Sequence, residues 1–302
     1  MSAEETKRTS NPPMGSPSPT KTPMFEATHA VRYARQAAIK AIEERCGCAL
    51  ICYVAGRAAP LESDDTIGFV DLLHNVERGQ NLDLLLHTGG GDMDAAEKLI
   101  SMVRSTVGDK RLRIIVPDFA KSSGTLMALG ANKILMSDSS ELGPIDPQII
   151  LADAHGNLIR HSVQSYLDAY EDHAQALQKN PNDVVARIML GKLDAATLKL
   201  FEAARVRAQR IAEEQLQRGM KVANNTKIAS ELIDTKRWLS HGQMISYQDA
   251  KQMGLEVDYL DPKGEEWQSY WRLYCQQRLA IKDREKLFES DYVSQSFETS
   301  SG

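Results

Sequence analysis

Short apolar runs alternate with amphipathic segments through the first half of the chain. Residues 28–45 carry apolar side chains at helical spacing and lead into the apolar run 49–54, which predicts a helix followed by a buried strand. The same order recurs, with further predicted strands at 82–86, 112–116 and 133–136 and further predicted helices at 67–78, 93–107 and 126–131. Strands that alternate with helices in this way favour an α/β fold with a largely parallel sheet.

The second half of the chain has a different pattern. Residues 163–219 are almost continuously helical in periodicity and contain a long amphipathic stretch at 194–217. The two ends have little to bury, because residues 1–25 are rich in Ser, Pro, Thr and Lys and residues 285–302 fade into Ser, Thr and Glu. The sequence therefore predicts a disordered arm over 1–25, one folded domain over 26–284 and a loose tail over 285–302.

The composition excludes several classes of protein. The 302 residues include 36 basic and 41 acidic side chains, so a formal net charge of −5 gives no global attraction to nucleic acid or anionic lipid. The apolar runs are shorter than the roughly 18–20 residues that a membrane-spanning helix needs. Residues 1–25 also lack the apolar region of a signal peptide. We expect a cytoplasmic protein without an integral membrane segment.

The cysteines do not indicate a disulfide framework or a metal site. Four cysteines are too few for such a framework in a chain of this length. Cys46, Cys48 and Cys52 lie close together in the sequence, and Cys275 is far away. A zinc site would need a second pair of ligands at metal-binding spacing, which these cysteines do not have nearby. We predict no metal and no cofactor, and we expect the cysteines to act as small buried hydrophobic residues.

Two turns follow predicted strands at their carboxyl ends, where α/β folds gather their chemistry. The first contains Gly89, Gly90 and Gly91, which allow a ligand to approach the backbone closely at the start of the next helix. The second contains Ser122 and Ser123. A serine at such a turn directs its hydroxyl and the N–H of the next residue toward the same point. A nucleophile and one donor of an oxyanion hole are arranged in this way. Taken alone, the triple glycine is more often a tight turn than an active site, and the serine turn is more often a helix N-cap. The two turns together favour acyl chemistry.

Three segments resemble a known family. They read LDLLLHTGGGDMDAAEKLI, IIVPDFAKSSGTLMALGANKILMSDSSELGPIDPQI and RWLSHGQMISYQDAKQMGLEV, within a match over about residues 30–260. They resemble the serine dehydrogenase proteinase family of the Clp/crotonase superfamily, which is similar to signal peptide peptidase A and the Clp protease subunit. The resemblance implies a Clp/crotonase-type ββα superhelix with a helical C-terminal half. It also implies serine-type endopeptidase activity on peptides or unfolded protein, and assembly into a homo-oligomer.

The resemblance assigns roles to single residues. The family pattern Ala-x-Ser-x-Gly falls on residues 120–124, which makes Ser122 the nucleophile, followed by Ser123 and Gly124. The N–H of Ser123 then belongs to the oxyanion hole. A frame shifted by one residue would make Ser123 the nucleophile instead. The second oxyanion donor is expected in the glycine turn, at the N–H of Gly90.

The general base is not identified by the sequence. At the place of the Clp histidine the chain has Asp146, which is able to orient a partner, accept a proton or simply form a turn. Signal peptide peptidase A uses a lysine from its helical region, and a buried lysine with a lowered pKa can do this work. By that analogy the candidates are Lys192, Lys179 and, with less support, Lys121. His241 is the best-placed histidine, because it lies in the family-like C-terminal segment.

Two other functions stay open. A crotonase-type acyl-CoA enzyme would use the same backbone donors for an enolate, together with a carboxylate pair for which Asp92 and Asp94 are available. A non-catalytic peptide-binding scaffold would keep the fold and lack the base. The polar N-terminal arm offers no membrane anchor, which favours released peptides or unfolded chains over signal peptides as substrates.

Overall fold

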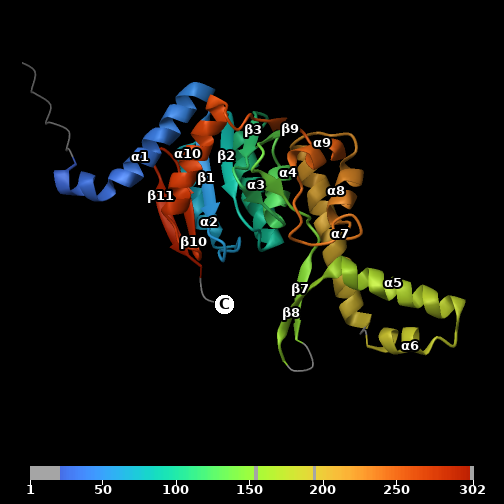
Figure 1. The fold of residues 1–302 in the computed structure, drawn as a ribbon. Coiled ribbons are helices and arrows are strands. Elements are labelled where there is room, and N and C mark those ends of the chain that lie inside the picture. The colour runs from blue at the N-terminus through green and yellow to red at the C-terminus, as the bar shows by residue number, and fades with distance from the viewer. Residues whose placement is uncertain (1–20, 153–155, 193–194, 300–302) are drawn as a thin grey trace, which may run out of the picture.

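The computed structural model describes residues 21–152, 156–192 and 195–299, and a seven-stranded sheet forms its centre (Figure 1). The strand order is β11-β10-β1-β2-β3-β5-β9. The strands from β1 to β9 in this order run parallel, and β10 and β11 continue the sheet in antiparallel fashion. Their bounds are β1 (Ala49–Ala55), β2 (Leu82–His87), β3 (Leu112–Ile115), β5 (Lys133–Met136), β9 (Val257–Tyr259), β10 (Glu285–Glu289) and β11 (Ser294–Glu298).

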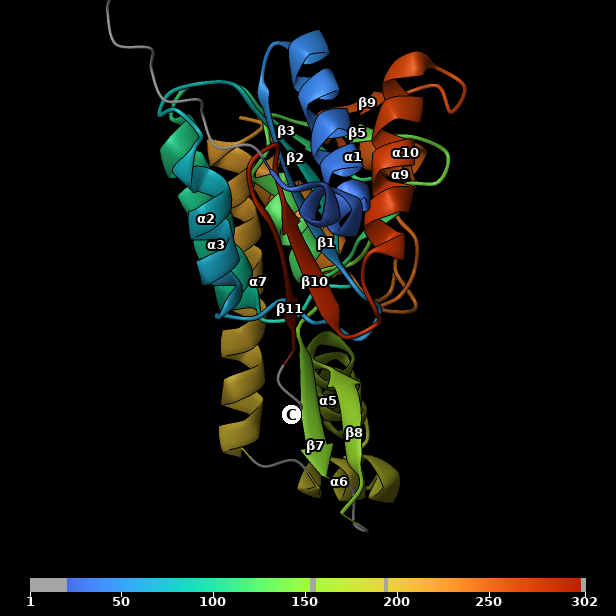
Figure 2. The same ribbon diagram turned by 90° about the vertical axis from the view of Figure 1, so that its left-hand side faces the viewer.

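Helices cover both faces of this sheet (Figure 2). One face packs against α1 (Pro23–Cys46) and α10 (Glu265–Leu279), and the other carries the larger apolar core. That larger core is formed with α2 (Asp65–His74), α3 (Met93–Val107), α4 (Ser123–Leu129), α7 (Ala195–Arg218), α8 (Asn225–Ile233) and α9 (Tyr247–Met253). Strand β2 is apolar on both sides because Leu84 and Leu86 enter the larger core while Leu85 enters the smaller one.

An arm projects from this core (Figures 1 and 2). It begins with an antiparallel hairpin of β7 (Gln148–Ala152) and β8 (Leu158–Ser162) and continues through α5 (Val163–Lys179) and α6 (Val184–Gly191). A small apolar cluster of Val163, Leu167 and Phe201 joins α5 to the first turns of α7. Helix α7 then runs back into the main core, so one long helix connects the arm to the part of the molecule that contains the large sheet.

The α/β architecture with a helical second half is confirmed, and the principal corrections concern the two ends. Helix α1 begins at Pro23, inside the segment predicted to be a disordered arm, while residues 1–20 lie outside the described part. The prediction of a loose tail over 285–302 is wrong for β10 and β11, because β10 pairs with β1, a strand inside the sheet, and β11 pairs with β10. The charges of β10 are buried against partners, with Lys286 Nζ 2.8 Å from Asp65 Oδ1. Residues 300–302 lie outside the described part. Within the described ranges, none of the helices combines the length and apolar character needed to span a bilayer.

Candidate active site

A strained turn leads from β4 (Phe119–Ala120) into α4 and carries Ser122. Ser122 has φ 54° and ψ −119°, the values of the first central residue in a type II′ turn. The N–H of Gly124 donates to the carbonyl of Lys121 at 2.8 Å and closes that turn. Residues other than glycine rarely adopt this conformation, and a serine that does so at a strand-to-helix turn presents its hydroxyl outward.

The glycine turn after β2 lies against the serine turn. The N–H of Thr88 donates to the carbonyl of Phe119 at 3.1 Å, and the N–H of Lys121 donates to the carbonyl of Thr88 at 3.0 Å. Gly90 has φ +93°, and a Cβ there would lie 2.6 Å from the Lys121 carbonyl oxygen and 2.8 Å from Ser122 Cβ. The missing side chain at Gly90 therefore allows the two turns to touch.

The residues of the glycine turn have different hydrogen-bond partners. The N–H of Gly90, expected to be the oxyanion donor, donates to Thr88 Oγ1 at 3.1 Å. Leu61 forms a parallel bridge with Gly91 and bonds to the backbone on either side of it. The Gly91 carbonyl accepts from Ser123 Oγ at 2.7 Å, so Gly91 lies against the serine turn.

The two serines of the turn differ in their surroundings. The Ser123 hydroxyl is engaged by the carbonyl of Gly91, and the residue is only 3% exposed. Ser123 is also the first residue of α4, so its N–H belongs to the unpaired donors at a helix start. This placement suits Ser123 as a backbone donor and leaves Ser122 as the candidate nucleophile.

Asp146 and His241 are brought together by short backbone pairings. Strand β6 (Glu141–Leu142) pairs in parallel with β4, and Leu142 exchanges two hydrogen bonds of 3.0 and 2.9 Å with Ile245. As a result His241 Nδ1 lies 2.6 Å from Asp146 Oδ1. The Asp146 side chain is 3% exposed and that of His241 is 24% exposed. A buried carboxylate on Nδ1 fixes the imidazole ring and leaves Nε2 for a reacting group.

These groups share one cavity of about 830 Å³. Its lining includes Ser122 and Ser123, the glycine turn 89–91, Asp146 and His241. Apolar side chains form much of the remaining wall: Leu61, Met93, Leu126, Ile145 and Ile150. The loop 57–62, which no motif in the sequence singled out, supplies another part of the lining.

The three candidate lysines do not occupy the position of a base. Lys121 Nζ lies 2.8 Å from Glu141 Oε2 and donates to the carbonyl of Gly242 at 2.7 Å, so its ammonium group is held in an ion pair. Lys179 ends α5 and Lys192 caps α6, and both are exposed on the arm. The lining of the cavity includes none of these three residues within the described ranges.

The carboxylates that an acyl-CoA enzyme would need are also engaged. Asp92 Oδ1 caps α3 by accepting from the N–H groups of Asp94 and Ala95 at 2.8 and 3.3 Å. Asp94 lies 2.7 Å from Arg207 Nη2 in an ion pair. Both side chains border the cavity, but their observed roles are a helix cap and a surface ion pair.

Comparisons with known proteins find two relatives in one organism. The chain is 28% identical over 213 residues to the uncharacterised protein MJ0137 of Methanocaldococcus jannaschii, covering 70% of this chain and 65% of the relative. It is 37% identical over 68 residues to MJ1495 of the same organism, covering 22% of this chain and 23% of the relative. The chain thus spans less than two thirds of the length of either relative.

Solved structures show weaker similarity. ClpP1 from Listeria monocytogenes matches with a TM-score of 0.38 and 12% identity, covering 74% of this chain and 94% of that one. A mutant of the 1510-N membrane-bound stomatin-specific protease matches with a TM-score of 0.30 and 19% identity, covering 71% of this chain and 99% of that one. The family model of ClpP-like SDH-type serine proteinases matches residues 62–284, most of the chain. The chain therefore belongs to the family of ClpP-like SDH-type serine proteinases.

Proposed function

We propose that this proteinase hydrolyses peptide bonds with Ser122 as nucleophile, His241 as general base and Asp146 as the orienting carboxylate. The observation that carries the proposal is the 2.6 Å contact between His241 Nδ1 and the buried Asp146, inside the cavity that Ser122 also lines. Asp146 keeps the imidazole proton on Nδ1, so Nε2 takes the proton of the Ser122 hydroxyl as that oxygen attacks the substrate carbonyl. Nε2 then returns the proton to the leaving amine.

Two backbone donors stabilise the oxyanion in this proposal. They are the N–H of Ser123, at the start of α4, and the N–H of Gly91, the residue whose carbonyl accepts from Ser123 Oγ. Such donors are fixed before the reaction begins, and removing one from a serine peptidase costs about 10²–10³-fold in rate. The engaged N–H of Gly90 instead holds the turn in shape through Thr88.

We further propose that the residue before the cleaved bond is apolar. Leu61, Met93, Leu126 and Ile145 give the cavity a largely apolar wall beside the reacting groups. An apolar substrate side chain that binds there is transferred out of water, and this burial contributes about 1.5–3 kcal/mol for a large side chain. A panel of fluorogenic peptides should show higher kcat/KM with Leu or Met than with Lys or Asp before the cleaved bond.

Covalent labelling tests the nucleophile. A fluorophosphonate probe should label the purified protein, and Ser122→Ala should abolish labelling. Ser123→Ala is the matched control, because it removes the neighbouring hydroxyl and keeps the backbone N–H; it should still be labelled. Labelling that survives Ser122→Ala, or that never occurs in protein shown to be folded, would contradict the proposal.

Kinetics test the other two side chains. His241→Gln and Asp146→Asn should each lower kcat by about 10²–10⁴-fold with an unchanged thermal melting temperature. His173→Gln, a histidine of α5 on the arm, is the control and should retain full activity. If all three variants have the activity of the wild type, His241 and Asp146 do not take part in the mechanism.

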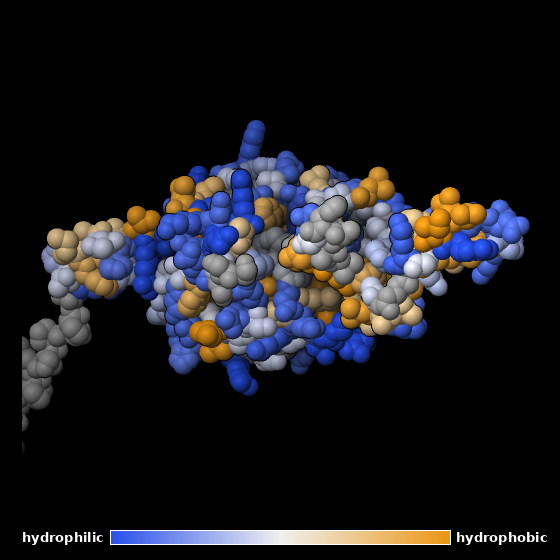
Figure 3. Space-filling model, turned by 90° about the horizontal axis from the view of Figure 1, so that it is seen from below, coloured by the Kyte–Doolittle hydropathy of each residue, from blue (hydrophilic) through white to orange (hydrophobic). Residues whose placement is uncertain are grey.

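We also propose that the protein works as a homo-oligomer that assembles through the arm. Helix α6 exposes Val184, Val185, Ile188 and Met189, and Figure 3 shows hydrophobic side chains gathered on the arm. Light scattering should therefore give a mass that is a multiple of the 33.5 kDa chain, and Val185→Glu combined with Ile188→Glu should reduce it. A monomeric wild-type protein would contradict this proposal. The expected cytoplasmic location stays a prediction.

A further inference from the structure

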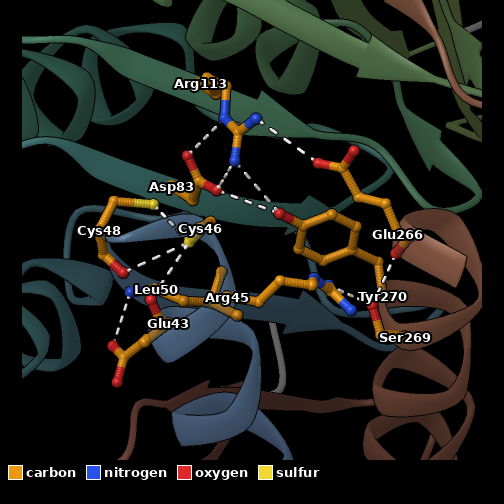
Figure 4. A network of polar contacts seen from close by, with 10 residues as sticks. All are labelled: Glu43, Arg45, Cys46, Cys48, Leu50, Asp83, Arg113, Glu266, Ser269 and Tyr270. Carbon is orange, nitrogen blue, oxygen red and sulfur yellow. Dashed lines mark hydrogen bonds and ion pairs between the residues drawn. The ribbon is translucent and has the colours of Figure 1, made fainter.

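A second cluster of polar side chains lies at the amino-terminal end of β1, the end opposite the loop that enters the active-site cavity (Figure 4). Cys46 is the last residue of α1, and Gly47 follows in the left-handed conformation with φ 63° and ψ 34°. This sharp reversal returns the chain toward the helix end, so that Cys46 Sγ lies 2.6 Å from Cys48 Sγ. Sulfurs joined in a disulfide are about 2.05 Å apart, so bond formation needs an approach of only about 0.6 Å.

We propose that Cys46 and Cys48 form a site of reversible oxidation, at which hydrogen peroxide converts the two thiols into an intramolecular disulfide. The proposal is independent of the peptidase mechanism, because neither cysteine lines the cavity of Ser122. It changes the interpretation of these residues as passive apolar filling, which suits the fully buried Cys52 but not the half-buried Cys46.

The surroundings give the two thiols different tasks. A hydrogen bond from the Cys48 thiol lowers the pKa of Cys46 to about 7, against the opposing effect of burial. The same contact, together with burial, raises the pKa of Cys48 well above its usual value. Cys46 therefore forms the thiolate and reaches solvent, while Cys48 is 8% exposed. The other charged or titratable groups around the pair are Glu43, Arg45, Asp83, Arg113, Glu266 and Tyr270 (Figure 4).

The chemistry balances with peroxide as the only added reactant. The Cys46 thiolate attacks one oxygen of hydrogen peroxide, and the O–O bond breaks. Cys46 becomes a sulfenic acid, and hydroxide is the leaving group. That hydroxide takes the proton of the Cys48 thiol and becomes water. The Cys48 thiolate then attacks the Cys46 sulfur and the S–O bond breaks. The departing hydroxide becomes a second water by taking up the proton that Cys46 released to solvent when it ionised. The two sulfurs together lose two electrons, which reduce the peroxide.

A metal ion fits the same residues less well. The sulfurs and the carboxylate of Asp83 lie within 4.8 Å of one another, which is a plausible set of zinc ligands. Tetrahedral zinc with Zn–S bonds of about 2.3 Å would hold the two sulfurs about 3.8 Å apart, but they lie 2.6 Å apart. Asp83 is fully buried and already engaged: its Oδ1 accepts from Arg113 Nε at 2.8 Å and its Oδ2 accepts from Tyr270 at 3.1 Å.

The test uses the reduced full-length protein and hydrogen peroxide. The intact mass should fall by two hydrogens and two of the four thiols should disappear, with both changes reversed by dithiothreitol. Cys52→Ser is the matched control from the same segment, and it should lose the same two thiols. No loss of two hydrogens from the wild type, or a disulfide that involves Cys52 or Cys275, would overturn the proposal.

Single variants test the order of attack. Cys48→Ser should leave a sulfenic acid on Cys46 that dimedone traps, and Cys46→Ser should slow oxidation at least tenfold. Because Cys48 is buried, Cys48→Ala is made in parallel, and the thermal melt of each reduced variant is compared with wild type. Equally fast oxidation of Cys46→Ser would overturn the assignment. Tight binding of one equivalent of zinc that blocks both thiols from peroxide would overturn the proposal in favour of a metal site.

Discussion

Replacing Ser122 by glycine should stabilise the fold while abolishing activity. The backbone at Ser122, with φ 54° and ψ −119°, suits glycine, whereas any residue with a Cβ is strained there. Strain of this kind costs about 1–3 kcal/mol. Glycine also has more freedom in the unfolded chain, which takes back about 0.5–1 kcal/mol. The free energy of unfolding of Ser122→Gly should therefore be about 1 kcal/mol higher than that of Ser122→Ala.

The comparison with Ser122→Ala isolates the Cβ, because both variants lack the hydroxyl. The same pair of variants at Ser123 is the control, since that residue is the first of α4 and lies outside the positive-φ residues of the chain. There glycine should be less stable than alanine by about 0.5–1 kcal/mol. Urea unfolding followed by circular dichroism measures all four variants.

The difference in unfolding free energy between the glycine and alanine variants should therefore have opposite signs at residues 122 and 123. A melting temperature should follow the same order, with about 2–4 °C for each kcal/mol in a chain of this size. If Ser122→Gly is no more stable than Ser122→Ala, the turn is not strained. If both positions favour glycine, the effect belongs to the whole loop, and the Cβ at residue 122 is not its cause.

Three further predictions concern packing, pH and the placement of the base. Gly68→Ala should destabilise the fold by about 1–3 kcal/mol in urea, although alanine is the better helix former, because its Cβ would lie 2.3 Å from the Phe288 ring. Burial raises the pKa of Glu43 to about 7, so between pH 4.5 and 7 the folded state keeps a proton that the unfolded state has released. The unfolding free energy of the wild type should therefore fall by about 1–2 kcal/mol across that window, and parallel pH curves for wild type and Glu43→Gln would contradict this. Lys121→Met should lower kcat about tenfold at unchanged melting temperature by releasing the loop of His241, and unaltered kinetics would show that the bond to this loop does not position the base.

The parallel half of the fold could be predicted because each of its elements carries its own periodic signal. Strand β2 is apolar at four of its six positions and lies buried on both faces, as its run of leucines indicates. Strand β10 could not be predicted in this way, because its charged residues are buried only through distant partners. Arg35 lies 2.8 Å from Glu289, its partner 254 residues away in the sequence. A segment whose charged residues are buried only through distant partners looks like a tail when its local composition alone is considered.

In the candidate site, too, the local motifs could be predicted and the long-range contact could not. Ser122 and the glycine turn were predicted, because a nucleophile turn is a local motif after a strand. Asp146 and His241 were each identified as candidates, but not as partners, since 95 residues separate them. Their contact depends on the pairing of Leu142 with Ile245, which no local pattern indicates.

The serine turn is bonded to both segments that carry the other candidate residues, His241 and Asp146. On one side of Ser122, Lys121 bonds to the carbonyl of Gly242, the residue after His241. On the other side, Thr125 Oγ1 accepts from the N–H of Gly143 at 3.0 Å and so fixes the segment that leads to Asp146. The turn that carries Ser122 is therefore bonded, through the side chains of Lys121 and Thr125, to the segments of the proposed base and the proposed orienting carboxylate. Ser122→Gly keeps this backbone conformation and should leave the contact between His241 and Asp146 in place, whereas Lys121→Met removes one of the two bonds and should loosen the segment of His241.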